Sequence, residues 1–394
     1  MIQTWALLLD AYRELNAKRL FWFVLALTAL VVLAFACVGL NQRGVQVLWW
    51  TFDSAVINTS YVPASMFYKL MFDALGIKFW LTWAATILAL VSTAAIIPDF
   101  IASGAIELTL SKPIGRLRLL YTKFATGLLF VGLQVSVFTV ACFFILGIRG
   151  ESWEPAIFLA IPLVLLFFSY LFSICLLAGL ITRSTIASLL LTLLAWVFFW
   201  ACGTADQITL VGLNDNGSRI QLLERKIRKQ ESNTRKLVRE QAVKEGKEPP
   251  RVEDLTPEIL DSNNPALVGT RTELAEVRKS RETWEYSQKI VLTVKAFVPK
   301  TAETIDLLQR VLVTTTELQS KVSNASDEAD EDTEEPADDR RRRRRGGGIF
   351  DNAEPDEIQM ELRKRSLWWV LGTSLAFEGM VLGIAGVIFV RRDF

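Results

Sequence analysis

Six long runs of apolar residues constrain the fold of this chain more than any other feature of its sequence. They cover residues 20–40, 80–97, 124–147, 156–182, 185–203 and 367–390. A helix needs about 20 mainly apolar residues to cross the roughly 30 Å apolar core of a bilayer. The apolar residues follow one another without the alternation typical of a β-barrel. The sequence therefore predicts an all-α membrane protein with six transmembrane helices.

Charged residues are concentrated between the fifth and sixth runs, in the segment 204–366. This segment holds 29 of the 43 lysines and arginines and 32 of the 42 aspartates and glutamates. We therefore expect a water-exposed insertion there, between residues 1–203 with the first five spans and residues 367–394 with the sixth span and a short tail. Residues 1–19 have the pattern of an interfacial helix. The net charge of +1 argues against a nucleic-acid-binding protein.

The insertion is predicted to be mainly helical. Residues 219–245 and 270–297 consist of good helix formers with spaced apolar positions. They could form an antiparallel hairpin, although polar residues interrupt the apolar stripe of a long coiled coil. Four prolines within 248–265 predict a loop between these helices, and residues 301–322 form a third expected helix.

Blocks of opposite charge follow the third expected helix of the insertion. Residues 327–339 are mainly acidic, and residues 340–345 are six consecutive arginines. Such blocks cannot bury apolar surface, so we predict a disordered tether over 324–350 in which the two blocks pair with each other. Binding of the arginines to anionic lipid or nucleic acid is the alternative.

Basic residues beside the spans predict the orientation of the chain. If both termini are cytoplasmic, the short cytoplasmic segments carry ten lysines and arginines, and the short outer loops carry four. The positive-inside rule favours this arrangement, with the insertion outside the cytoplasm. Three further basic residues next to the last span lie on the outer side and reduce the difference between the two sides. They are Arg363, Lys364 and Arg365.

Residues that most enzyme chemistry requires are missing. The sequence has no histidine and no G-x-x-x-x-G-K-[ST] nucleotide-binding loop. Its four cysteines are far apart, inside or at the end of apolar runs, so neither a zinc site nor a disulfide framework is expected. These cysteines are Cys37, Cys142, Cys175 and Cys202. We therefore expect no enzymatic activity, no cofactor and no metal.

Two features of the last apolar run stand out, a carboxylate and a glycine motif. Glu378 lies near the middle of the last run, where an isolated carboxylate is unfavourable, so it should face protein or water. It could contact substrate, a proton or a partner helix, or it could accept a hydrogen bond from another span through Gln134 or Ser169. Gly379 and Gly383 beside it form a G-x-x-x-G motif, which permits close helix packing.

The segment 98–127, PDFIASGAIELTLSKPIGRLRLLYTKFATG, resembles the intracellular loop of ABC-2 type transporter permeases, the membrane subunits of ATP-binding cassette transporters. The similarity is closest to a bacterial group associated with copper-enzyme maturation. The residues that carry it are Gly104, Ile106, Leu110, Ser111, Lys112, Pro113, Ile114 and Arg116. The ending Arg391-Arg392-Asp393-Phe394 and the six-span topology also resemble that family. The long insertion departs from its compact members.

The resemblance implies an exporter in the bacterial inner membrane, driven by a separate ATPase subunit and built on a homodimer or heterodimer of permease chains. Residues 99–110 would form a coupling helix that docks on the ATPase, and Pro113 cannot continue that helix. The implied coupling residues are Ile101, Gly104, Ile106, Glu107, Lys112, Pro113 and Arg116. The alternative is a scaffold or signalling protein that binds an extracytoplasmic partner through residues 204–323 and transports nothing.

Overall fold

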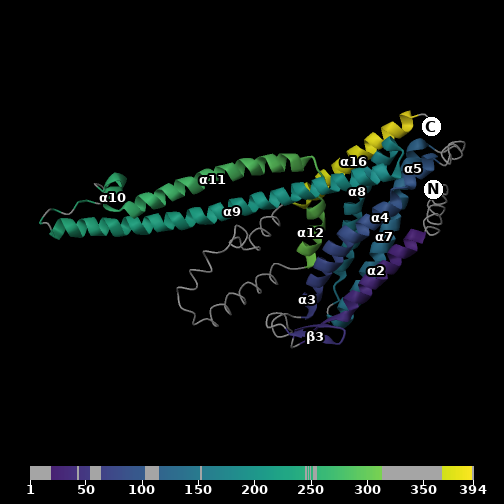
Figure 1. Cartoon of the computed structure of the whole chain (residues 1–394), viewed down its shortest axis with the longest axis horizontal. Helices are drawn as coiled ribbons and strands as arrows, with labels where there is room; N and C mark the ends of the chain where they lie inside the picture. The colour runs from purple at the N-terminus through teal and green to yellow at the C-terminus, as the bar shows by residue number, and fades with distance from the viewer. Residues whose placement is uncertain are drawn as a thin grey trace. The chain divides into compact units, whose positions relative to one another are not determined.

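The computed structural model describes residues 19–41, 44–53, 64–102, 115–150, 153–244, 246, 248, 250–251, 255–312 and 366–392 (Figure 1). These residues fall into two compact units. The apolar unit contains the described residues of 19–201, 297–312 and 366–392, and the hairpin unit contains those of 202–296. The expected tether at 324–350 lies outside the described residues, as do residues 1–18 of the expected interfacial helix.

Within the described ranges, five helices are long and apolar enough to cross a membrane. They are Ser65–Ile101, Arg116–Arg149, Pro155–Thr182, Thr185–Lys244 and Leu367–Arg391. The first expected run, 20–40, forms the shorter helix α2 (Arg19–Cys37), whose apolar part is Phe21–Cys37. A helix of 17 residues rises only about 26 Å. The structure thus agrees with a mainly helical membrane protein and provides five helices of spanning length rather than the six expected.

A small sheet follows α2, where the sequence predicted only helix. Strands β1 (Val38–Asn41), β2 (Gly44–Val47) and β3 (Trp50–Asp53) pair antiparallel in the order β1-β2-β3. The chain remains mainly helical, in agreement with the all-α prediction, and this small sheet ends the helix three residues before the apolar run ends. Four-residue strands are too short to produce a clear alternating pattern among apolar neighbours.

The second expected span is longer than its apolar run, 80–97. It consists of α3 (Ala64–Met71), the π-helix η1 (Phe72–Ala85), α4 (Thr86–Thr93) and α5 (Ile96–Ala102). In η1 the backbone is wider than in an α-helix, and the Thr82 hydroxyl donates to the carbonyl oxygen of Ile77, five residues earlier, at 2.9 Å. Such helices are rare and often lie at functional sites.

The next two spans are α7 (Arg116–Arg149) and α8 (Ala160–Thr182), with the short 3₁₀ helix η2 (Pro155–Leu159) leading into α8. A break follows α8, in the gap between the apolar runs 156–182 and 185–203. Arg183 adopts a left-handed conformation with φ 54°, and its N–H donates to the carbonyl oxygen of Gly179 at 3.0 Å. This cap ends α8 before α9 (Thr185–Lys244) begins.

Helix α8 forms the centre of the apolar unit and packs against α7 and α16 (Leu367–Arg391). Of its most apolar window, 72% is buried, against 22% for α9. The Phe172 ring stacks on Phe124 of α7 with centroids 5.3 Å apart. It also covers Gly127, where a Cβ atom would overlap the ring. The absence of a side chain at Gly127 therefore permits the close approach of α7 to α8.

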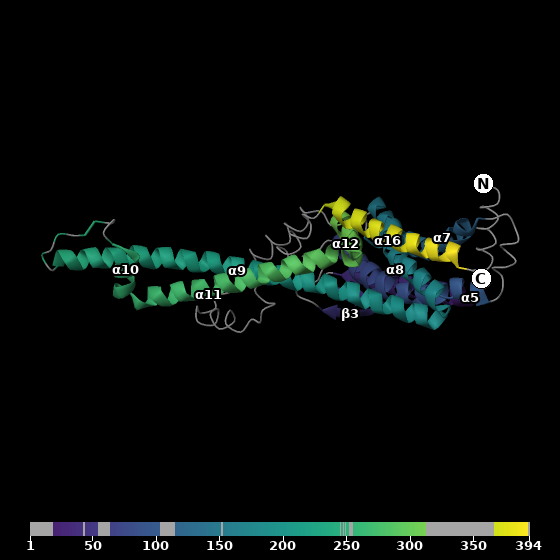
Figure 2. The same ribbon diagram turned by 90° about the horizontal axis from the view of Figure 1, so that it is seen from above.

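The hairpin unit consists of the second part of α9 with α10 (Pro257–Asn263) and α11 (Pro265–Ala296), and α9 and α11 lie side by side (Figure 2). The expected antiparallel hairpin is present in these residues, and α10 replaces part of the expected loop at 248–265. Two small apolar clusters hold the helices together, one around Leu260 and Leu267 and one around Leu223 and Val277. The third expected helix begins as α12 (Thr301–Leu312), which belongs to the apolar unit.

Candidate functional site

One end of the apolar unit joins two segments that carry the family resemblance. Arg116, the first residue of α7, donates hydrogen bonds from Nη1 to the carbonyl oxygens of Val390 at 3.0 Å and Arg392 at 3.1 Å. The last carbonyl groups of a helix have no partner within it, so a guanidinium is well suited to bind them. The beginning of α7 is therefore fastened to the end of α16.

A second arginine extends this clamp to α8. The Arg392 guanidinium donates to the carbonyl oxygen of Leu180, near the end of α8. The Lys123 ammonium of α7 lies 5.2 Å from the ring centroid of Phe100, which connects α7 to α5. These contacts join α5, α7, α8 and α16 near residues 102 and 115, which flank the segment 103–114.

The structure describes only part of the expected coupling residues. Ile101 is partly buried and packs against the main apolar core, and Arg116 forms the clamp. The others, Gly104, Ile106, Glu107, Lys112 and Pro113, lie outside the described residues.

Glu378 lies at the interface between α16 and α8. Its side chain is buried, and Ser169 of α8 donates a hydrogen bond to its Oε2 at 3.0 Å. Ser169 is one of the two partners that the sequence suggested. Gln134, the other, is buried on α7, where its Nε2 has no hydrogen-bond partner among the described residues. It lines a cavity of ≈ 10 Å³, which is about the space of one water molecule.

The sequence analysis missed a buried lysine at the start of α12. Lys300 is 1% exposed, and its backbone N–H donates to the Ser374 hydroxyl of α16 at 2.9 Å. Its ammonium group donates to Thr373 and lies 4.0 Å from the ring centroid of Trp369. Cation–π contact and hydrogen bonding offset the desolvation of the charge. A lysine that begins a short helix, outside every apolar run, carries no signal of such burial.

Two carboxylates flank one lysine between η1 and α12. Lys78 lies 3.3 Å from Asp73 and 3.4 Å from Asp306, measured from Nζ to the carboxylate oxygens. Although 33% of the Asp306 side chain stays exposed, burial raises the pKa of its carboxyl above the ordinary value, and Lys78 opposes part of that rise. These three residues connect the first long apolar helix to the segment after the hairpin.

The predicted packing glycines of the last span lie on an open face. A Cβ atom at Gly379 or Gly383 would meet nothing within 4 Å in the described part of the chain. Gly386, one turn further, lies against Leu117 of α7. The G-x-x-x-G motif thus makes no close contact within the described residues, and its use between two chains stays a prediction.

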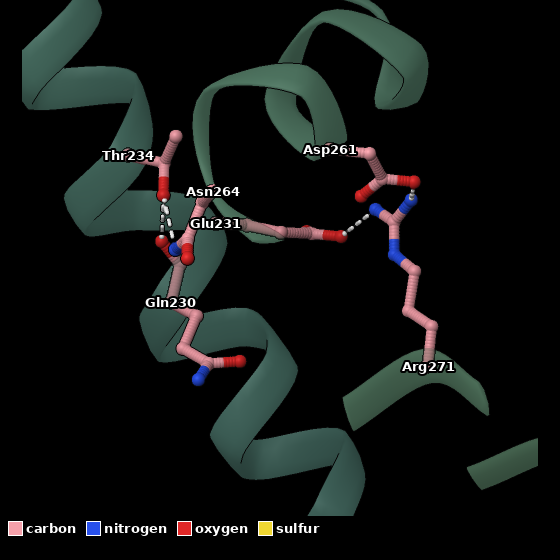
Figure 3. Close-up of polar contacts among 6 residues, drawn as sticks. All are labelled: Gln230, Glu231, Thr234, Asp261, Asn264 and Arg271. Carbon is pink, nitrogen blue, oxygen red and sulfur yellow. Dashed lines mark hydrogen bonds and ion pairs between the residues drawn. The ribbon is translucent and has the colours of Figure 1, made fainter. Parts of the chain in front are cut away.

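A charged cluster joins the three helices of the hairpin unit near its tip (Figure 3). Arg271 of α11 donates to Glu231 of α9 at 2.6 Å and to Asp261 of α10 at 2.8 Å. The hydrogen bond to Glu231 is the main reason that the pKa of Arg271 is raised. Asn264 donates to the Thr234 hydroxyl at 2.9 Å. This network fixes α10 against both long helices.

Beside this cluster, a groove of ≈ 520 Å³ runs along α11. Its lining comprises Ile227, Arg271, Leu274, Ala275, Arg278, Lys279 and Glu282. Apolar side chains with charged groups around them are typical of surfaces that bind protein segments. The groove is therefore a candidate binding surface of the hairpin unit.

Neither a metal centre nor a relative identifies the chemistry of the protein. Within the residues that the structure describes, no group of three or more cysteines, aspartates or glutamates is placed to hold a metal ion. Comparison with known proteins found no matching family model, no matching curated protein and no matching solved structure.

Proposed function

We propose that this chain is the membrane-spanning subunit of an ATP-binding cassette exporter whose energy comes from a separate ATPase. The observation that carries the proposal is the clamp in which Arg116, from the family-like loop, binds the carbonyl groups of Val390 and Arg392, from the family-like ending. The two segments are joined although 274 residues separate Arg116 from Val390. Five helices of spanning length agree with a multi-pass membrane subunit.

The clamp supports a route for mechanical coupling. A displacement of the 103–114 segment by an ATPase would act on Arg116 and hence on the end of α16. Arg392 would pass the same movement to α8, the most buried of the long apolar helices. Both termini would lie in the cytoplasm of a bacterium, with the ATPase on that side and two permease chains in the complex.

The test is co-purification with an ATPase encoded beside the gene, followed by measurement of its ATP hydrolysis with the permease in lipid. We expect a stoichiometric complex with an altered hydrolysis rate. Ile106→Asp and Glu107→Arg should abolish that change without reducing membrane insertion. Glu258→Arg, an exposed glutamate of α10, is the matched charge-reversal control and should behave as wild type. Unchanged hydrolysis in every variant would contradict the coupling role.

The groove on α11 favours a second function, in which the hairpin unit binds a partner and the chain transports nothing. The two functions differ in a measurable way. If the chain is a scaffold, Leu274→Asp in the groove should release a bound partner, and Ile106→Asp should have no effect on any associated ATPase.

A further inference from the structure

The part of α9 that belongs to the hairpin unit carries a buried aspartate. Asp206 is 0% exposed, and its Oδ2 lies 2.7 Å from the ammonium of Lys295 on α11. A buried ion pair is unusual in a hairpin whose other inter-helical ion pairs, among the described residues, are partly exposed, such as the pair of Arg278 and Glu224. Burial of both charges indicates that the surroundings of this pair contain little water.

The sequence around the pair is apolar on both helices. Asp206 is the sole charged residue of α9 between 185 and 213, and Lys295 is the sole charged residue of α11 between 290 and 296. The two charges that interrupt these apolar segments therefore neutralise each other. Charged residues resume at Asp215 on α9 and at Lys289 on α11.

The apolar side chains beside the pair nonetheless remain uncovered. Tyr286, Ile290 and Val294, spaced four residues apart on one face of α11, are 68%, 49% and 40% exposed. Ile208 on α9 is 43% exposed. Exposed apolar side chains that recur along one face of α11, beside a buried ion pair, indicate a surface that is at least partly covered by something other than water.

The length of α9 indicates what covers this surface. Residues 185–213 form one uninterrupted helix, which rises about 43 Å. A bilayer with its headgroup regions is about 40–45 Å thick, whereas its apolar core is about 30 Å. The apolar segment of α9 thus exceeds the core and matches the whole bilayer. Asp206, about 32 Å along this segment, would lie close to the boundary between acyl chains and headgroups.

We propose that the base of the hairpin, formed by Ile208, Tyr286, Ile290 and Val294, is immersed in the lipid headgroup layer and contacts lipid directly. The Asp206–Lys295 pair allows two charged helices to enter that layer together, because neither charge is left unpaired there. Tyr286 at the outer edge has the amphipathic ring that is typical of a membrane interface. The inference needs a membrane but no ATPase, so it is independent of the proposed transport function.

The experiment places a genetically encoded nitroxide amino acid, one position at a time, in the full chain reconstituted in vesicles of phosphatidylethanolamine and phosphatidylglycerol. Relaxation of the nitroxide by oxygen reports lipid, and relaxation by a water-soluble nickel chelate reports water. At 290 and 294 we expect the ratio of oxygen relaxation to nickel-chelate relaxation to be higher than at a position in water. Leu237, which is 58% exposed on α9 outside the base, is the matched control and should favour the nickel chelate.

Two results would overturn the proposal. Positions 290 and 294 could favour the nickel chelate as strongly as 237, which would place the base in water. Alternatively, both relaxers could be excluded while nitroxides at 290 on two chains broaden each other, which would make a second copy the occupant of this face.

The ion pair provides a second measurement. Lys295→Met leaves the Asp206 carboxylate without its ammonium partner and should reduce the yield of inserted protein several-fold. The double variant Asp206→Leu/Lys295→Leu should restore the yield and keep the lipid signature at 290. A double variant that restores the yield but loses the lipid signature at 290 would contradict immersion of the base.

Discussion

The two units of this chain hold their charged side chains in different ways. In the apolar unit, Lys300 and Glu378 are 1% and 8% exposed, and each lies against polar groups of a neighbouring helix. In the hairpin unit, only the Asp206–Lys295 pair among the described ion pairs is buried, whereas the Arg271–Glu231 and Arg278–Glu224 pairs further along the helices are partly exposed. Buried charges are expensive to leave unpaired, whereas exposed pairs contribute little. Close packing should therefore contribute most of the free energy of unfolding of the apolar unit. The hairpin unit should depend more on many surface contacts that are each weak.

The largest effect that this difference predicts is at Gly127. Gly127→Leu would force a branched side chain into the Phe172 ring, because even a Cβ atom overlaps it. Overpacking typically lowers the free energy of unfolding by about 1–3 kcal/mol. Here the Phe172 ring is held by stacking on Phe124 and Phe168. Thermal unfolding of the detergent-solubilised protein measures the loss.

The control for this substitution is Gly379→Leu on α16. No described atom lies within 4 Å of a Cβ at that position, so the free energy of unfolding should change by less than about 0.5 kcal/mol. A loss as large as that of Gly127→Leu would instead indicate that another subunit covers the G-x-x-x-G face.

A smaller effect is expected in the hairpin unit. Arg271→Met removes hydrogen bonds to both Glu231 and Asp261 and should destabilise the attachment of α10 by about 1 kcal/mol. Arg278→Met removes one more exposed contact, to Glu224, and should have a smaller effect. Limited proteolysis near residue 250 in urea measures both. Equal losses in the two variants would show that the three-helix network adds nothing beyond single surface pairs.

The smallest predicted effect is a dependence on pH at Asp306. Since burial raises the pKa of Asp306 in the folded state, the folded protein keeps a proton that the unfolded chain has already released. The free energy of unfolding should therefore fall as pH rises from the ordinary aspartate pKa of about 4 to the raised pKa. Thermal unfolding across this range measures the slope, and Asp306→Asn should flatten it.

Lys78 allows this assignment to be checked. Its ammonium lowers the pKa of Asp306, so Lys78→Met should extend the decline in stability to higher pH. If the slope is the same in wild type, Asp306→Asn and Lys78→Met, another group titrates.

Local signals were sufficient for several elements. The apolar runs at 124–147, 156–182, 185–203 and 367–390 all lie on long helices, and the break at Arg183 is present. Helix signals in a sequence are strong where they extend over many residues. The π-helix, the small sheet and α10 were missed, because each depends on short segments whose preferences the surrounding contacts override.

The site was less predictable than the fold. Glu378 and Ser169 could be named in advance, since a carboxylate within an apolar run requires a partner. The sequence does not indicate that Lys300 is buried. This residue lies at the start of α12 and becomes buried only through contact with Thr373 and Trp369 of α16. Most of the expected coupling segment, 103–114, lies outside the described residues.

The sequence by itself determined that this chain forms long apolar helices and a charged helical insertion, since hydropathy and helical periodicity are properties of consecutive residues. Only the tertiary structure decided which charges meet. Arg116 reaches the end of α16, and Asp206 reaches Lys295, 89 residues away. Such pairings depend on the rotation and register of packed helices, which no local pattern specifies.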